Sequence, residues 1–265
     1  MRSERKLLRN LVLKSCSRRL QQKLRKFYVA RQIMGKHISQ EREMSLLGSL
    51  VVEGDCVADI GACVGVYTKA LSSLVGSCGR VYAFEPILEN YEILEAVIKK
   101  ACLSNVHPFH AALGSEMGEG TMVIPDLEGF TGFYWAHLAE VGEPGRQRAV
   151  NVLTLDRLKE NRRIPRLDFI KCDVEGRELE VIRGGIEFIR SQHPGWLMEV
   201  SRPASNSVFS ALKNMGYQAF VYNSKLIKTE NYRDKEYSNY FFFHPGSNIW
   251  QRVVPLTLET QVAPG

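Results

Sequence analysis

Short apolar runs alternate with segments of helical periodicity from residue 51 onward, and this alternation constrains the fold more than any other feature. Strands that are joined through helices by short connections form a parallel sheet with helices on both faces. The sequence therefore predicts an α/β fold with a doubly wound, mostly parallel sheet. The expected strands are 56–60, 80–84, 106–113, 168–172 and 196–200, and the expected helices are 66–75, 87–101, 176–190 and 205–214.

The pattern changes at its C-terminal end. Apolar runs at 218–222 and 239–243 have no helix between them. Strands joined without a crossover helix pair in the antiparallel sense. We therefore expect these two strands to form an antiparallel hairpin at the end of the sheet.

Residues 114–156 interrupt the alternation. Runs at 120–124 and 149–155 have strand character, and a long segment rich in glycine and aromatic residues lies between them. Long loops inside compact domains are usually functional, and glycines permit closure. We interpret the insertion as a lid over a substrate; the alternative is a loop packed at the edge of the core. The lid aromatics are Phe130, Phe133, Tyr134 and Trp135.

Nearly all of the positive charge lies at the N-terminus. Residues 1–36 contain twelve Lys and Arg and one acid, Glu4, so the remainder carries −5 although the whole chain carries +6. Apolar residues recur there at helical intervals. Packing on the body or on a partner chain is the favoured interpretation, and binding to anionic lipid or a polyanion is the alternative. The expected organisation is a basic helical extension (1–50), an α/β domain (51–250) and a tail (251–265).

The six cysteines form no Cys-x-x-Cys pair and have no metal-like spacing with histidine. They are therefore interpreted as reduced thiols of a cytoplasmic protein, with peripheral membrane contact through residues 1–36 as a variant. No apolar run approaches the length of a membrane span.

The pattern of residues 57–68 predicts a strand, a turn with two glycines and the start of a helix. Open α/β sheets bind ligands at the carboxyl ends of their strands, and glycine lets a ligand approach the backbone. A dinucleotide fingerprint needs a central glycine where this chain has Cys63. Asp59, which precedes the turn, would repel a pyrophosphate and attract a cation. The turn therefore favours S-adenosylmethionine, which carries an ammonium and a sulfonium but no phosphate.

Two further strand ends carry acids. Glu85 ends the second strand, where a carboxylate can accept hydrogen bonds from both ribose hydroxyls. The run at 168–172 delivers Asp173 and Glu175 to the same edge of the sheet, where both can contact the donor or the acceptor. For Glu175, charge matching at the N-terminus of the next helix is the alternative.

Together these segments resemble the FkbM family of methyltransferases. The resemblance covers roughly residues 51–200, and its last segment is the most specific. It implies the class I methyltransferase (Rossmann-like) fold, S-adenosylmethionine as donor, and O-methylation of a hydroxyl on a sugar or natural product. The matching residues, in order, are Asp59-Ile60-Gly61-Ala62, Gly65, Tyr67-Thr68, Phe84-Glu85-Pro86, Ala111-Ala112-Leu113-Gly114, Asp156, Phe169-Ile170-Lys171-Cys172-Asp173-Val174-Glu175-Gly176, and Glu178-Leu179.

The resemblance also implies roles for individual residues. The methionine end of the donor would lie against Asp59, Gly61 and Gly65, and the methyl group near Asp173. The ribose would bind Glu85, and the adenine would lie near 110–112. The family commonly has Asn at the position of Cys63, and a thiol is the weaker hydrogen-bonding group. The expected donor-binding residues are Asp59, Gly61, Ala62, Cys63, Gly65, Tyr67, Thr68, Glu85, Pro86, His110, Ala111, Ala112, Asp173 and Glu175.

Methyl transfer to a hydroxyl requires positioning of the acceptor oxygen and benefits from a general base. The candidate bases are Asp173, Glu199 and His137, with His110 also considered. Glu199 ends the strand after the one that delivers Asp173, and a structural role at the surface is its alternative. Two acids are too few to define a metal site, so the sequence leaves a metal requirement open.

Two other functions stay open at this stage. A nicotinamide-dependent oxidoreductase lacks support, because the central glycine and a Tyr-x-x-x-Lys pair are missing. A non-catalytic binding module is the second alternative. We expect a small-molecule or glycan acceptor and no nucleic acid, because a body with net charge −5 offers no evident basic path for a polyanion. The oligomeric state is not indicated.

Overall fold

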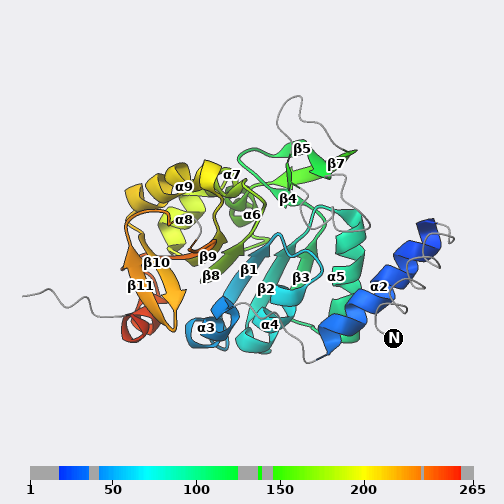
Figure 1. The fold of residues 1–265 in the computed structure, drawn as a ribbon, viewed down its shortest axis with the longest axis horizontal. Helices are drawn as coiled ribbons and strands as arrows, with labels where there is room; N and C mark the ends of the chain where they lie inside the picture. Colours follow the sequence, from blue (N-terminus) through cyan, green and yellow to red (C-terminus); the bar gives the residue numbers. More distant parts are fainter. Residues whose placement is uncertain (1–17, 36–41, 125–136, 139–145, 234–235, 258–265) are drawn as a thin grey trace, which may run out of the picture.

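The structure is a computed structural model that describes residues 18–35, 42–124, 137–138, 146–233 and 236–257 (Figure 1). Its core is an eight-stranded sheet with the order β11-β10-β12-β9-β8-β1-β2-β3. Five of these strands run parallel: β1 (Cys56–Ile60), β2 (Arg80–Phe84), β3 (Val106–Phe109), β8 (Phe169–Cys172) and β9 (Gly195–Glu199). The mostly parallel sheet expected from the sequence is confirmed.

Helices cover both faces of the sheet because successive strand residues point to opposite sides. Ala58, Ile60 and Ile170 pack against the layer made of α6 (Leu155–Glu160), α7 (Glu178–Arg183), α8 (Ile186–Gln192) and α9 (Arg202–Asn214). Val57 and Phe169 pack on the other face, against α3 (Arg42–Leu50), α4 (Val66–Val75), α5 (Leu88–Lys100) and α10 (Trp250–Val253). A short 3₁₀ turn, η2 (Val254–Leu256), follows α10. The arrangement is doubly wound.

The C-terminal strands differ from the expected hairpin. The expected strands are present as β10 (Gln218–Asn223) and β12 (Asn239–Phe243), and they pair antiparallel. However, β12 lies between β10 and β9 and is antiparallel to both, while the hairpin partner of β10 is β11 (Lys225–Thr229). The sequence analysis missed β11 because Lys225 and Lys228 make it less apolar than its neighbours, as suits an edge strand.

Two other expected elements are divided. The run 106–113 leaves the main sheet after Phe109, and β4 (Ala112–Leu113) joins a second sheet. The helix expected over 176–190 is interrupted at Gly184-Gly185. A Cβ atom on Gly184 would lie 1.9 Å from the carbonyl oxygen of Gly114, so the two backbones touch there and only glycine fits.

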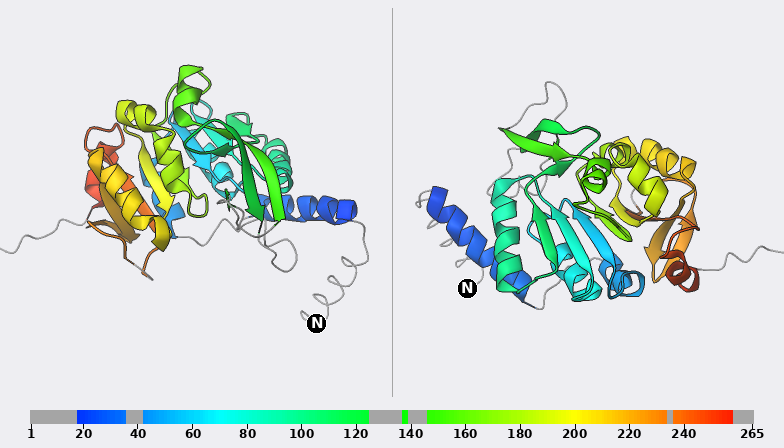
Figure 2. Two further views of the ribbon diagram at one scale, coloured as in Figure 1. Left: turned by 90° about the horizontal axis from the view of Figure 1, so that it is seen from above. Right: turned by 180° about the vertical axis from the view of Figure 1, so that it is seen from behind.

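The insertion at 114–156 contributes this second sheet, with the order β4-β7-β5-β6 (Figure 2). Its other strands are β5 (Gly118–Ile124), β6 (His137–Leu138) and β7 (Arg146–Leu153). The strand expected over 149–155 ends at Leu153, because the hydroxyl of Thr154 accepts a hydrogen bond from the Arg157 N–H and caps α6. The lid aromatics at 130, 133, 134 and 135 lie outside the described residues.

The N-terminal extension packs on the body wherever it is described. Helix α2 (Arg18–Met34) lies across α5, as Figures 1 and 2 show from different sides. Helix α3 buries Leu46, Leu47 and Leu50 in the core on the face of the sheet that carries α4. Both helices therefore pack on the body, and for α2 this is the favoured interpretation of residues 1–36. In the described part of the chain, no helix is long and apolar enough to cross a membrane.

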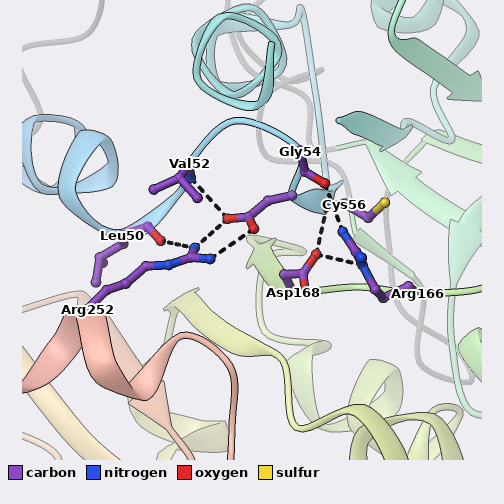
Figure 3. A network of polar contacts seen from close by, with 8 residues as sticks. Leu50, Val52, Gly54, Cys56, Arg166, Asp168 and Arg252 are labelled. Carbon is purple, nitrogen blue, oxygen red and sulfur yellow. Dashed lines mark hydrogen bonds and ion pairs between the residues drawn. The ribbon is translucent and has the colours of Figure 1, made fainter. Parts of the chain in front are cut away.

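A polar network at the end of the sheet away from the strand carboxyl ends joins distant parts of the chain (Figure 3). Arg252 of α10 donates to both oxygens of Asp55, at 2.5 and 3.1 Å, and to the carbonyl of Leu50 at 2.8 Å. Beside it, Arg166 contacts Asp168 at 3.0 Å, and the Asp168 carboxylate accepts the Cys56 N–H. These contacts tie α10 to the start of β1.

We expect Arg252→Ala to lower the free energy of unfolding by roughly 2–3 kcal/mol, because it leaves the buried Asp55 carboxylate without its charged partner. Urea denaturation measures the change. Arg157→Ala is the control: its partner Glu160 and Arg157 itself are more than half exposed, so its loss should cost less than about 1 kcal/mol. Equal effects of the two substitutions would contradict this account.

Candidate functional site

A cavity of about 1090 Å³ opens at the carboxyl ends of β1, β2 and β8. This is the edge at which open α/β sheets bind their ligands. The turns after the three strands form its floor, and α2 and the second sheet form part of its sides. The lining includes the expected donor residues Gly61, Ala62, Cys63, Tyr67, Glu85, Pro86, Ala111, Ala112, Asp173 and Glu175.

The turn after β1 is folded tightly onto the ends of its two neighbouring strands. The N–H groups of Gly61 and Ala62 both donate to the carbonyl of Phe84, at 3.1 and 2.8 Å. A Cβ atom on Gly61, whose φ is +77°, would lie 1.8 Å from the Asp173 carbonyl oxygen. Glycine is therefore required at 61 both by the close approach and by the backbone conformation.

Cys63 adopts the left-handed conformation, with φ of +50°. Among residues other than glycine, Asn is especially tolerant of this region. In this structure the backbone N–H of Cys63, rather than its side chain, makes the polar contact, donating to Glu85 Oε2 at 2.9 Å. Because this donor belongs to the backbone, the contact with Glu85 does not depend on whether residue 63 is Asn or Cys.

Glu85 is held rigidly in the cavity wall by backbone donors. Its Oε1 accepts from the Ile87 N–H at 2.7 Å and its Oε2 from the Cys63 N–H at 2.9 Å. Burial raises the pKa of Glu85 to about 7, although these hydrogen bonds favour the ionised form. A carboxylate oxygen can accept more than one hydrogen bond, so both oxygens can still accept from ribose hydroxyls.

A buried charge cluster connects β1 with β8, which lie side by side with Asp59 opposite Lys171. The Lys171 ammonium is 3.1 Å from Asp173 Oδ2, 3.2 Å from the Gly61 carbonyl oxygen and 3.9 Å from Asp59 Oδ1. Thr68 donates to Asp59 Oδ2 at 2.5 Å, whereas Asp59 Oδ1 has no hydrogen-bond partner among the described residues. The three charges sum to −1, which suits a cationic ligand at the adjoining cavity.

Electrostatics in the cluster follow from burial and proximity. Burial raises the pKa of Asp59, partly opposed by Lys171 and Thr68. For Lys171, burial alone would lower the pKa, but the carboxylates of Asp173 and Asp59 outweigh it and raise the pKa. Lys171 lines the cavity, and the sequence analysis did not single it out. A lysine within an apolar strand is a readable signal, but its partner Asp59 becomes visible only when β1 and β8 are paired.

Comparison of the sequence with models of known protein families identifies the family to which this site belongs. The Methyltransferase FkbM domain matches residues 59–219, more than half of the chain. The chain belongs to the FkbM methyltransferase family. Membership confirms the resemblance seen in the sequence and supports S-adenosylmethionine, rather than a nicotinamide, as the cofactor. The matched range contains Asp59, Glu85, Lys171 and Asp173 but not α2.

Solved structures with a similar fold include several methyltransferases. A methyltransferase FkbM from Methylobacillus flagellatus KT is 16% identical with a TM-score of 0.50; the match covers 74% of this chain and 48% of that one. The chain of the present structure thus spans about half the length of the Methylobacillus protein. A putative rRNA methylase from Clostridium thermocellum is 12% identical, with a TM-score of 0.46 and coverage of 76% and 91%. No curated protein matches the sequence.

We name the larger cavity the donor cavity, because most of the expected donor residues line it. The remaining expected donor residues lie behind its wall or outside it. Asp59 and Thr68 are fully buried behind its wall, and Gly65 packs against Leu94 of α5. His110 is exposed and stacks on Tyr91, with ring centroids 4.8 Å apart. None of these four predicted donor residues lines the cavity.

The structure places the three predicted bases differently: Asp173 borders two cavities, Glu199 lines only the smaller of them, and His137 lines neither. A smaller cavity of about 190 Å³ is lined by Glu199, Ser238 and Asn239, and it shares Tyr67, Lys171 and Asp173 with the donor cavity. His137 pairs with Val123 in the second sheet and lies near enough to Glu175 to influence its titration. Burial raises the pKa of Glu175 to about 7, with further increases from Asp173 and Glu178. Within the described residues, no group of three or more His, Cys, Asp and Glu could hold a metal ion.

Proposed function

We propose that this FkbM methyltransferase transfers the methyl group of S-adenosylmethionine to a hydroxyl of a sugar or hydroxylated natural product. The observation that carries the proposal is the position of Asp173, which borders both the donor cavity and the smaller cavity. A donor held in the first cavity and an acceptor held in the second would meet at this carboxylate.

The donor cavity has the chemistry that S-adenosylmethionine requires. Glu85 offers two fixed carboxylate oxygens for the ribose hydroxyls, and the charge cluster of Asp59, Lys171 and Asp173 is net negative beside the methionine end. The bound donor supplies an activated methyl group on a sulfonium. The chain's own part is to hold the acceptor oxygen in line with that methyl group and to receive its proton.

The smaller cavity favours a polar acceptor. Glu199, Ser238 and Asn239 bring a carboxylate, a hydroxyl and an amide to its lining, next to Asp173. Such groups can donate to and accept from the several hydroxyls of a sugar. We assign Asp173 as the residue that orients the reacting hydroxyl and accepts its proton, with Glu199 as a second acceptor of hydrogen bonds.

The test is transfer of labelled methyl from S-adenosylmethionine by the purified full chain. Cell extract is separated into polar small molecules, lipids, RNA and protein before incubation. The proposal expects label in the polar fraction or in a glycan-bearing fraction, with mass spectrometry placing the added methyl on oxygen. Label confined to RNA or to protein nitrogen would overturn it, and absence of label in any fraction with intact donor binding would favour a non-catalytic binding module.

Donor binding should depend on pH through Glu85. The ionised carboxylate accepts the ribose hydroxyls, so affinity for S-adenosylhomocysteine should be full above the raised pKa of about 7 and fall as the pH drops through it. The fall should approach tenfold per pH unit below that value. Calorimetry between pH 5.5 and 8.5 measures it, and Glu85→Gln should bind weakly without this dependence. A wild-type affinity that does not change across the range would contradict the assignment.

A further inference from the structure

The N-terminal helix α2 forms one side of the donor cavity, although it lies outside the matched family domain. Figures 1 and 2 show the helix crossing α5 beside the carboxyl ends of β1 and β2. Residues from its last turns and the glycine after it face the cavity that also contains Glu85. These residues are Tyr28, Val29, Arg31, Gln32, Ile33 and Gly35.

Apolar packing joins α2 directly to the turn after β1 (residues 61–65), which we call the donor loop. Ala30 and Ile33 are buried in one cluster with Val64, which belongs to the turn after β1, and with Ile93 and Val97 of α5. At the end of the helix, the Lys69 ammonium donates to the Ile33 carbonyl oxygen at 2.8 Å. A cation at this position satisfies a free carbonyl group and complements the helix dipole. The helix is therefore held by the same loop that forms the donor site.

A buried hydrogen-bond relay runs from α2 to the ribose-binding carboxylate. Arg25 Nη2 donates to Asn90 Oδ1 at 2.9 Å, and both side chains are buried. Asn90 lines the same cavity as Glu85, and its side chain is among the hydrogen-bonding groups that counteract the raised pKa of the Glu85 carboxyl. Arginine can only donate, so Oδ1 of Asn90 must face Arg25 and its NH₂ group is left to face Glu85. Arg25 thereby fixes which end of the amide points into the site.

We propose that α2 is an integral part of the donor-binding site and that Arg25 is a positioning residue that acts through Asn90 on Glu85. The ligand concerned is the adenosyl part of S-adenosylmethionine or S-adenosylhomocysteine, so the inference rests on the donor site proposed above. Because α2 contacts both the donor loop and the relay to Glu85, docking of the helix and binding of the donor stabilise each other.

The experiment uses the full chain and three proteins: wild type, Arg25→Met and Lys26→Met. Lys26 is the matched control, because it is the next residue on the same helix but its ammonium is 3.9 Å from Glu92, with both side chains partly exposed. Calorimetry gives the affinity for S-adenosylhomocysteine. Hydrogen exchange with and without this ligand gives the protection of residues 18–34, and protection of β8 reports the intact fold.

We expect Arg25→Met to weaken S-adenosylhomocysteine about 5- to 10-fold, or about 1.0–1.4 kcal/mol, with Lys26→Met close to wild type. In the wild type, the ligand should slow exchange in residues 18–34, and Arg25→Met should lose this effect. The inference is overturned if Arg25→Met and the wild type bind S-adenosylhomocysteine with equal affinity. It is also overturned if the ligand does not change hydrogen exchange in residues 18–34 of the wild type, because α2 would then have only a structural role. Failure of the wild type itself to bind would instead refute the proposed donor site. The wild-type exchange result stands even if Arg25→Met does not fold.

Discussion

Replacing Asp173 with Asn is expected to reduce methyl transfer by roughly 10²- to 10⁴-fold while leaving the fold and donor binding largely intact. Asn keeps an oxygen that can accept the hydrogen bond now made by Lys171, 3.1 Å away. It cannot accept the proton of an acceptor hydroxyl. The measurement is the single-turnover rate with labelled donor, using the acceptor fraction that the transfer assay identifies.

The controls for this variant separate chemistry from structure. Affinity for S-adenosylhomocysteine and the urea midpoint should change far less than the rate, because Asn keeps the hydrogen bond from Lys171 and Asp59 keeps its charge. Glu116→Gln, which removes an exposed acid that lines neither cavity, should leave the rate unchanged. Full turnover by Asp173→Asn would show that Asp173 is not the base and would favour Glu199, in the smaller cavity, instead.

Replacing Lys171 with Met is expected to lower the free energy of unfolding by about 3–5 kcal/mol, the range seen when one partner of a buried ion pair is removed. Methionine has nearly the same length as lysine, so the substitution preserves the packing. It removes the charged partner of the Asp59 carboxylate, which is fully buried. Urea denaturation at pH 8 measures the loss. Lys213→Met, whose exposed pair with Glu230 is worth little, is the control.

The pH dependence of the Lys171→Met deficit has a definite sign. Burial already raises the pKa of Asp59, and loss of the neighbouring ammonium raises it further. An acid whose pKa is higher in the folded state destabilises the fold as the pH rises above its unfolded value. The deficit should therefore be smaller at pH 5 than at pH 8. Asp59→Asn in the same chain should restore much of the stability at pH 8; no restoration would show that packing rather than charge causes the loss.

The donor site was the part of the molecule most fully predictable from the sequence. Gly61, Glu85 and Asp173 each follow an apolar run, and the carboxyl ends of parallel strands meet at one edge of a sheet. Local pattern and topology together therefore placed them beside one cavity, where the structure has them. His110 follows the same rule of position but stacks on Tyr91 instead, because the chain turns out of the main sheet after Phe109.

Contacts between residues far apart in the sequence could not be predicted in the same way. The register of β1 against β8 brings Lys171 to Asp59 across 112 positions of chain, and no local pattern specifies that register. The same holds for Arg25 and Asn90, and for the insertion of β12 between β9 and β10. Each depends on which apolar faces are buried together, which is a property of the whole core.

The sequence by itself determined the class of fold, the cofactor and the family, because hydrophobic periodicity and a few glycines and acids at strand ends act locally. The tertiary structure decided which of those acids line a cavity. It placed Asp59 behind the cavity wall as the partner of Lys171, left Asp173 between two cavities, and made a basic N-terminal helix one side of the larger cavity. These outcomes follow from burial and from the pairing of distant charges, both of which exist only once the chain has folded.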